Sequence, residues 1–127
     1  MVWLAEPRRT LLVVDDDTSI LRAFRRIFER NGYTVATAET GREAMEQMEA
    51  CGFDAALVDL RLPDMDGTSL LSRMREKPKM VRIVLTGMPY SESAERAIGA
   101  GADVFLSKPV HPELLLNVLE RKLKEKI

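Results

Sequence analysis

Hydrophobic residues in this chain gather into short runs, separated by longer stretches of mixed polarity. Three of the runs suit strands that are buried on both faces, and the central one, Ala55-Ala56-Leu57-Val58, stops abruptly at Asp59. Two shorter runs are rich in β-branched and aromatic residues, which is typical of strands. The pattern predicts five strands, at residues 10–14, 33–37, 55–58, 81–85 and 104–106.

Between the strands, apolar residues recur three and four positions apart, which is the spacing of an amphipathic helix. In the first such segment, Asp17 or Thr18 can cap the amino end. In the last segment, Leu116, Leu119 and Leu123 form the stripe that we expect to face the sheet. The pattern predicts five helices, at about 18–31, 40–52, 68–76, 91–100 and 111–126.

The alternation of strands and helices along the chain decides the fold class. Successive strands joined by helices run parallel, and right-handed crossovers place the helices on both faces of the sheet. We therefore predict an α/β protein with a doubly wound, parallel, five-stranded sheet. Within the 127 residues we expect one domain at residues 10–127, preceded by an N-terminal extension at residues 1–9.

Composition excludes several classes of function. Nineteen Lys and Arg against twenty Asp and Glu give a net charge of −1, so the overall charge does not indicate direct contact with nucleic acid or a membrane surface. The single Cys51 rules out an internal disulfide and fits a reducing compartment, and the single His111 rules out a multi-histidine metal site. The first nine residues lack the apolar core of a signal peptide, and no apolar run is long enough to span a bilayer. We therefore expect a cytoplasmic protein.

The candidate chemistry lies where the strands end. Asp15 and Asp16 follow the first strand, Asp59 follows the third, Thr86 ends the fourth and Lys108 comes after the fifth. In a parallel sheet these ends share one edge, where ligands of open α/β proteins bind. Three carboxylates at one edge repel one another unless they are protonated or share a cation, and a few hard oxygen ligands suit Mg²⁺. The sequence therefore predicts a magnesium site at this edge.

These residues stand in motifs that resemble the receiver domain of two-component response regulators, over roughly residues 9–125. The matching motifs are Leu11-Leu12-Val13-Val14-Asp15-Asp16, Val58-Asp59, Leu62-Pro63-Asp64-Met65-Asp66-Gly67, Leu85-Thr86-Gly87, Gly101-Ala102-Asp103-Val104-Phe105 and Lys108-Pro109. The resemblance implies a flavodoxin-like (βα)5 fold with strand order 2-1-3-4-5. It also implies that the chain accepts a phosphoryl group from the phosphohistidine of a sensor histidine kinase or a phosphotransfer protein.

By this resemblance, Asp59 is the nucleophile that becomes an aspartyl phosphate. Asp16, with Asp15 assisting directly or through water, would hold Mg²⁺ together with Asp59. The backbone carbonyl of Arg61 would supply a further ligand. The cation would offset the negative charge of the carboxylates and of the incoming phosphoryl group. Such a domain catalyses only its own phosphorylation and dephosphorylation, so we do not expect an enzyme that acts on separate substrates.

Three further roles follow from the resemblance. Lys108 would place its ammonium on one phosphoryl oxygen, and Thr86 would donate its hydroxyl to another. Phe105 would be the switch aromatic, turning inward when Thr86 moves toward the phosphate. The surface that responds would hold a homodimer or contact an output domain, and it consists of residues 91–100, 104–106 and 111–126.

Several alternatives share parts of this pattern. The same fold could be the receiver module of a hybrid histidine kinase or of a larger multidomain regulator. A pseudo-receiver that only binds proteins would normally have lost Asp59, the acidic pair or Lys108, and all of these are present. Asp64-Met65-Asp66-Gly67-Thr68 matches a haloacid-dehalogenase phosphatase motif, but there the first aspartate directly ends a buried strand, whereas here Pro63 intervenes.

Two details are predicted for the surroundings of the site. The Lys108-Pro109 bond is expected to be cis, because the chain must turn back over the strand ends after a short last strand. Arg61 and Met88, two residues beyond Asp59 and Thr86, are expected to overhang the phosphate without orienting a water molecule. The sequence therefore predicts slow self-dephosphorylation.

Overall fold

A computed structural model describes residues 8–77, 79–87 and 92–126 of the protein. Five strands and five helices alternate along these residues, close to the predicted bounds. The strands are β1 (Arg9–Val14), β2 (Tyr33–Ala38), β3 (Ala55–Val58), β4 (Val81–Thr86) and β5 (Val104–Ser107). The helices are α1 (Thr18–Arg30), α2 (Gly41–Ala50), α3 (Gly67–Met74), α4 (Glu92–Gly99) and α5 (Pro112–Glu125).

All five strands run parallel in one sheet, in the order β2-β1-β3-β4-β5. This confirms the strand order that the family resemblance implied. β1 begins at Arg9, one residue earlier than predicted, because Arg9 pairs with Tyr33 in the ladder. In the middle of the sheet, Val14 lies beside Val58 and Val58 beside Val84, so the ends of β1, β3 and β4 meet at one edge.

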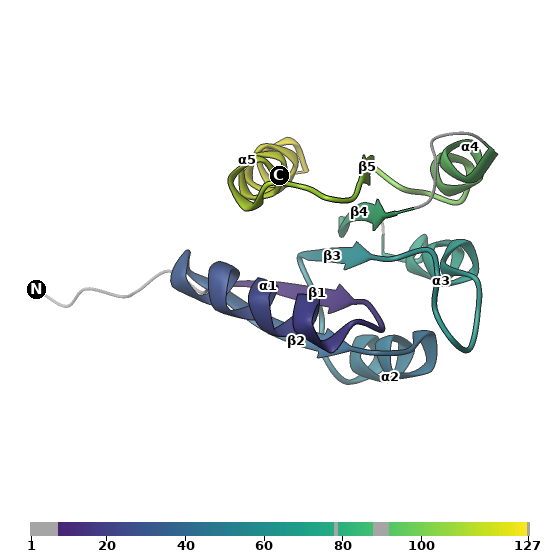
Figure 1. Ribbon diagram of the computed structural model, residues 1–127, viewed down its shortest axis with the longest axis horizontal. Coiled ribbons are helices and arrows are strands. Elements are labelled where there is room, and N and C mark those ends of the chain that lie inside the picture. The colour runs from purple at the N-terminus through teal and green to yellow at the C-terminus, as the bar shows by residue number, and fades with distance from the viewer. Residues whose placement is uncertain (1–7, 78, 88–91, 127) are drawn as a thin grey trace, which may run out of the picture.

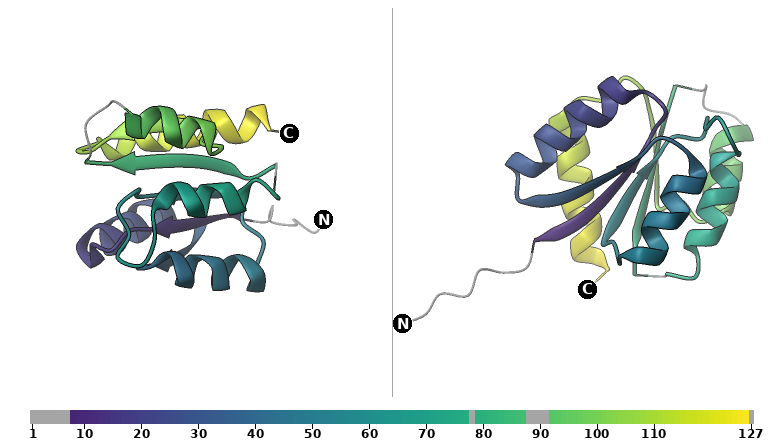
Figure 2. Two further views of the ribbon diagram at one scale, coloured as in Figure 1. Left: turned by 90° about the vertical axis from the view of Figure 1, so that its right-hand side faces the viewer. Right: turned by 90° about the horizontal axis from the view of Figure 1, so that it is seen from below.

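Helices cover both faces of this sheet. Figure 1 shows α1 and α5 on one face and α2, α3 and α4 on the other, and the right-hand view of Figure 2 shows the sheet between these two layers. Successive side chains of a strand point to opposite faces, so the core has two halves. The half under α1 and α5 includes Leu11, Val13, Phe28, Leu57, Ile83, Leu115 and Leu119, and the half under α2, α3 and α4 includes Leu12, Val14, Met48, Val58, Leu70, Val84 and Ala97.

The inner stripe of α5 differs from the prediction. Leu115, Leu119 and Leu123 are buried, whereas Leu116 is only partly buried. An α-helix turns by about 100° per residue, so Leu115 lies about 40° from Leu119 around the axis, while Leu116 lies about 60° away on the other side.

No helix among the described residues has both the length and the apolar character needed to cross a bilayer.

Candidate functional site

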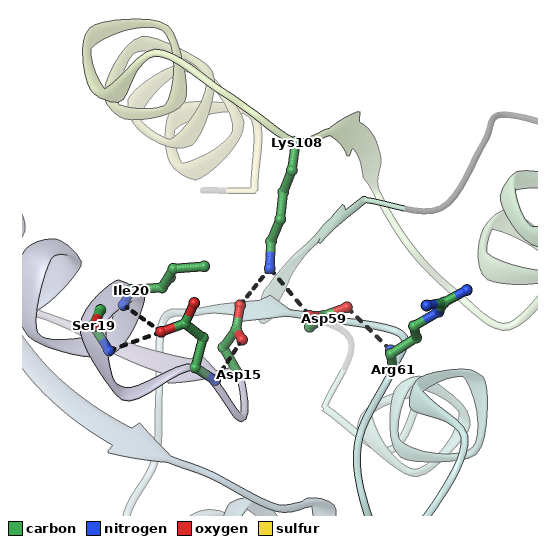
Figure 3. Close-up of polar contacts among 7 residues, drawn as sticks. Asp15, Ser19, Ile20, Asp59, Arg61 and Lys108 are labelled. Carbon is green, nitrogen blue, oxygen red and sulfur yellow. Dashed lines mark hydrogen bonds and ion pairs between the residues drawn. The ribbon is translucent and has the colours of Figure 1, made fainter.

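Asp15 and Asp59 lie side by side at the carboxyl ends of β1 and β3. The register aligns Val14 with Val58, so the next residue of each strand is an aspartate. The N–H of Asp59 donates to the carbonyl of Val14 at 3.0 Å, which carries the pairing one step past β3. Both aspartates are buried, with 4% and 7% of their surface exposed. Figure 3 shows the side chain of Lys108 reaching between them.

Each of these aspartates uses one carboxylate oxygen to hold the loop that leaves its strand. Asp15 Oδ1 accepts the N–H of Asp17 at 2.9 Å, and Asp59 Oδ1 accepts the N–H of Arg61 at 3.0 Å. A hydrogen bond from an aspartate to the backbone two residues on is an Asx-turn. The carboxylate of Asp17 in turn caps α1, as one of the two predicted candidates. The second oxygen of Asp15 and of Asp59 is left for another partner.

That partner is Lys108, which approaches from the loop after β5. Its Nζ donates to Asp15 Oδ2 at 2.7 Å and to Asp59 Oδ2 at 3.1 Å. Its backbone N–H donates to the carbonyl of Thr86 at 2.8 Å, which fixes the start of the loop on β4. The peptide bond to Pro109 is cis, which confirms the prediction. One ammonium therefore bridges two carboxylates that would otherwise repel one another.

Burial and pairing have opposite effects on this cluster. Burial raises the pKa of Asp15, and the hydrogen bond from Lys108 opposes that rise. Burial acts to lower the pKa of Lys108, but the hydrogen bonds to Asp15 and Asp59 outweigh it, so the pKa of Lys108 lies above its ordinary value. A raised lysine pKa keeps the ammonium charged at neutral pH. Positive charge is therefore held between the two strand ends.

The same edge fits a divalent cation. Carboxylate oxygens of Asp15, Asp16 and Asp59 lie within 4.8 Å of one another. Asp16 is exposed while the other two are buried, so the oxygens stand between the core and the solvent. Hard oxygen ligands that are few in number and open to water are the donors that Mg²⁺ prefers in proteins. The residues present therefore match the predicted magnesium site in type and in placement.

Thr86 and Phe105 are placed on one face of the sheet. β4 and β5 pair so that Val84 lies beside Phe105 and Thr86 beside Ser107. Residues two apart on a strand share a face, so Thr86 shares its face with Phe105. Thr86 is fully buried, and Phe105 is partly buried against the half of the core that contains Ala97 of α4. The two residues predicted to form the switch therefore face the same layer of side chains.

Comparison with known proteins decides the family. A family model described as the response regulator receiver domain matches residues 11–120. The chain belongs to the response regulator receiver family. A CheY-like response regulator receiver domain protein from Methanospirillum hungatei JF-1 has a crystal structure that is 40% identical, with a TM-score of 0.91 over 94% of this chain and 97% of that chain.

Two further relatives of the receiver domain bear on its function. A response regulator from Burkholderia pseudomallei, solved with a phosphorylated aspartic acid, a calcium ion and citrate, is 33% identical, with a TM-score of 0.84 over 92% of this chain and 69% of that chain. The alginate biosynthesis transcriptional regulatory protein AlgB of Pseudomonas syringae pv. tomato is 37% identical over 94% of this chain. The chain spans only 27% of the length of AlgB.

The two residues predicted to overhang the site of the receiver domain have different outcomes. Figure 3 shows the side chain of Arg61 extending away from Asp59, and this exposed side chain lines a surface cavity with Arg96 of α4. The predicted cover over Asp59 is therefore not formed by Arg61 in this structure, because its guanidinium lies on the solvent side of the loop. Met88 lies outside the described residues.

Sequence reasoning assigned no role to Asp64, which it noted only as part of the receiver-like motif at residues 62–67 and as the first residue of the phosphatase-like motif. In the receiver domain its carboxylate accepts the N–H groups of Gly41 and Arg42, each at 2.9 Å. Asp64 is exposed and ends no strand, so it does not have the position of a buried nucleophile. Its partners lie 23 and 22 residues away, and local spacing contains no signal for such a contact.

Proposed function

We propose that this receiver domain accepts a phosphoryl group on Asp59, from a phosphohistidine and with Mg²⁺ bound. The observation that carries the proposal is that Lys108 donates to both Asp15 and Asp59 at one edge of the sheet. Three carboxylates gather there within 4.8 Å, including that of Asp16. The Burkholderia pseudomallei relative, with its phosphorylated aspartic acid and calcium ion, supports the same chemistry.

In the proposed transfer, a carboxylate oxygen of Asp59 forms a bond to phosphorus while the phosphorus–nitrogen bond of the donor histidine breaks. The electron pair of that bond returns to the imidazole, so no oxidant or reductant is needed. Asp59 is oriented for the reaction by the N–H of Arg61. Lys108 is positioned to move its ammonium from the carboxylates to a phosphoryl oxygen.

Mg²⁺ would be held by Asp15, Asp16 and Asp59, with the backbone carbonyl of Arg61 as a further ligand. When bound, it would supply positive charge to the phosphoryl oxygens as they approach the buried carboxylates. The N–H of Arg61 already donates to Asp59, so the backbone of Arg61 lies next to the site. The exposed position of Asp16 leaves one side of the site open to water and to the phosphodonor.

Thr86 and Phe105 form the proposed switch. The Thr86 hydroxyl would donate to a phosphoryl oxygen, and Phe105 would turn inward because it shares a face of the sheet with Thr86. The surface of α4, β5 and α5 would then change shape. We propose that this surface holds a homodimer or contacts an output domain.

A sensor histidine kinase or a phosphotransfer protein is the proposed phosphodonor, and the proposed compartment is the cytoplasm. We place the receiver domain at residues 10–127, after an extension at residues 1–9. Because AlgB is several times longer than the matched region, an output segment in a larger multidomain regulator fits the comparison. A receiver module in a hybrid histidine kinase is the second candidate. The domain would catalyse only its own phosphorylation and dephosphorylation.

Incubation with acetyl phosphate and Mg²⁺ tests the proposal. Intact mass spectrometry should show one added phosphoryl group on the wild type and none on Asp59→Asn. Asp66→Asn is the matched control, because Asp66 is an exposed aspartate in the same loop whose side chain caps α3, while its bridge to Arg61 is made by backbone atoms that the substitution keeps. It should be labelled like the wild type.

Chelation tests the role of the cation. EDTA should abolish labelling, because the phosphodonor then meets three carboxylates without a cation to offset them. Full labelling of Asp59→Asn would show that another residue accepts the phosphoryl group. Labelling that is indifferent to EDTA would remove Asp15 and Asp16 from the proposed metal site.

A further inference from the structure

The loop between β3 and α3 (residues 59–66) is closed at its base. Arg61 and Asp66 form an antiparallel bridge, and the N–H of Gly67 donates to the carbonyl of Leu60 at 2.9 Å. A Cβ on Gly67 would lie 2.6 Å from Leu60 Cα and 2.7 Å from the carbonyl oxygen of Asp59, so a side chain cannot be accommodated there. The first residue of α3 is therefore pressed against the backbone that follows β3.

The tip of this loop, residues 62–65, is held by the start of α2. Asp64 Oδ1 accepts the N–H of Gly41, and Asp64 Oδ2 accepts the N–H of Arg42. These donors belong to the first two residues of α2. The side-chain hydroxyl of Thr40, the helix's own N-cap, accepts the N–H of Glu43 at 3.0 Å. Asp64 therefore completes the capping of α2 from a distant loop.

Charge and packing strengthen the contact between the loop and α2. The first turn of a helix carries unpaired N–H groups and a partial positive charge, which favour a carboxylate. The backbone hydrogen bonds from Gly41 and Arg42 accordingly lower the pKa of Asp64. The side chain of Met65 occupies the place where a Cβ on Gly41 would lie. The tip is thus both hydrogen-bonded to α2 and packed against it.

We infer that Asp64 is a positioning residue for cation binding: by fixing the tip of the loop on α2, it keeps the backbone of Arg61 beside Asp59. The inference rests on the proposed function, since the carbonyl of Arg61 matters only if the site takes up Mg²⁺. The base of the loop alone holds Arg61 by one bridge to Asp66 and one hydrogen bond to Asp59. Without the Asp64 anchor, residues 62–65 can move, and the backbone of the adjacent Arg61 can move away from Asp59 with them.

The effect should appear in the affinity for Mg²⁺ of the unphosphorylated chain, measured by isothermal titration calorimetry. Loss of a residue that orients a metal ligand typically weakens binding by about 10- to 100-fold. Asp64 orients one ligand of several, so we expect Asp64→Ala to raise the dissociation constant for Mg²⁺ by about tenfold, the low end of that range. Asp64→Asn keeps one acceptor oxygen and should give an intermediate value.

Thr40→Ala is the matched control, because it removes a capping bond from the same turn of α2 without touching the loop. Both alanine variants should lower the urea midpoint, since each loses capping of one helix. Only Asp64→Ala should weaken Mg²⁺ binding, while Thr40→Ala should stay within about twofold of the wild type because the metal ligands keep their supports. Amide exchange at Gly41 and Arg42, followed by NMR, reports directly whether the anchor is lost.

The outcomes separate this inference from the proposed function. If Asp64→Ala frees the Gly41 and Arg42 amides yet binds Mg²⁺ like the wild type, Asp64 serves α2 alone and the inference is overturned. The same holds if Thr40→Ala weakens binding equally, because the effect would then belong to helix stability. If the wild type takes up neither Mg²⁺ nor a phosphoryl group, the proposed function fails and this inference fails with it.

Discussion

Arg82 is a charged residue inside the sheet, and it provides a sharp test of how β4 and β5 are held together. It is the second residue of β4 and is only 8% exposed. Its Nη1 donates to the carbonyl of Met74 at 3.2 Å. Its Nε lies 3.7 Å from Asp103 Oδ2, beyond hydrogen-bond distance, and has no hydrogen-bond partner within the described residues. The buried guanidinium is therefore incompletely satisfied.

Asp103 makes two contacts in addition to facing this guanidinium. Its Oδ2 accepts the backbone N–H of Arg82 at 2.7 Å, and its Oδ1 pairs with Lys126 Nζ at 3.2 Å. Asp103 directly precedes β5, and Lys126 directly follows α5. One carboxylate therefore joins β4, β5 and the end of α5. Its removal would leave the backbone N–H of Arg82 without its acceptor, would take the facing carboxylate away from the Arg82 guanidinium, and would remove one ion pair of Lys126.

We predict that Asp103→Ala lowers the free energy of unfolding by about 3 kcal/mol. An orphaned buried N–H costs about 1–3 kcal/mol, and a buried charge left without its partner costs about 3–5 kcal/mol. The two costs overlap, because both depend on the same carboxylate. The Asp103 side chain is also 22% exposed, so water recovers part of the loss. The expected loss therefore lies at the low end of the range for a buried charge that loses its partner.

Arg82→Met should behave differently. Methionine has a similar reach without the charge, and Asp103 keeps both the backbone N–H of residue 82 and the ammonium of Lys126. Asp103 is also partly exposed, so losing the Arg82 guanidinium does not leave it as an uncompensated buried charge, and we expect a change within about 1 kcal/mol. On this background, Asp103→Ala should cost about 2 kcal/mol, mainly from the orphaned N–H and to a smaller extent from the partly exposed ion pair with Lys126.

Urea unfolding of the four proteins, followed by circular dichroism, gives the complete double-mutant cycle. Equal m-values would show that the variants unfold in the same two-state manner. Equal and large losses for both single variants would refute the reasoning, because the ion pair itself would then stabilise the fold. A harmless Asp103→Ala would refute it as well, since water would then satisfy Arg82.

Two further predictions concern Arg61 and Tyr33. Because the Arg61 side chain extends away from Asp59 (Figure 3), phosphorylated Arg61→Ala should lose its phosphoryl group within about twofold of the wild-type rate, and faster decay would show that Arg61 swings across the phosphate. Burial raises the pKa of Tyr33 from 10.0 to about 12, so tyrosinate absorbance should show a late step that Tyr33→Phe removes. Since the unfolded phenol ionises first, the free energy of unfolding should fall as the pH rises above 10.0; completion of all tyrosine ionisation near pH 10.0 would contradict this.

The strands were predictable because few other structures suit a short apolar run with polar residues at both ends. β3 has the predicted bounds, Ala55–Val58, since all four of its residues are buried. Which strands lie side by side in the sheet was not predictable, because the apolar runs contain no information about strand neighbours. The strand order came from the family resemblance instead, and the ladder confirms it.

The positions of the candidate site residues were predictable because each follows or ends its own strand, but their contacts were not. Lys108 was expected to meet a phosphoryl oxygen, and in this structure its ammonium joins Asp15 to Asp59. Arg61 was expected to cover the site, and its side chain extends toward α4. Side-chain directions depend on neighbours that are distant in sequence, so patterns of spacing do not determine them.

Aspartates that precede a strand have structural roles in this sheet, and strand direction explains why. Asp54 precedes β3, and its Oδ2 accepts the N–H of Thr10 at 2.8 Å. Asp103 precedes β5, and its Oδ2 accepts the N–H of Arg82 at 2.7 Å. At the amino ends of parallel strands, backbone N–H groups lack a partner in the ladder, and a neighbouring carboxylate satisfies them.

Aspartates that follow a strand find no free backbone N–H groups of the ladder beside them. At the carboxyl ends, the backbone groups left over are carbonyls, which repel a carboxylate instead of donating to it. Asp15 and Asp59 therefore accept the local N–H groups of Asp17 and Arg61 and the ammonium of Lys108, and their remaining lone pairs face the edge of the sheet. Because all strands run the same way, every aspartate that follows a strand comes to the same edge, where a cation is the partner that relieves their repulsion. The order of residue and strand along the chain thus separates the aspartates that hold the start of a strand from those that gather at the candidate site, which is why that gathering could be predicted from the sequence.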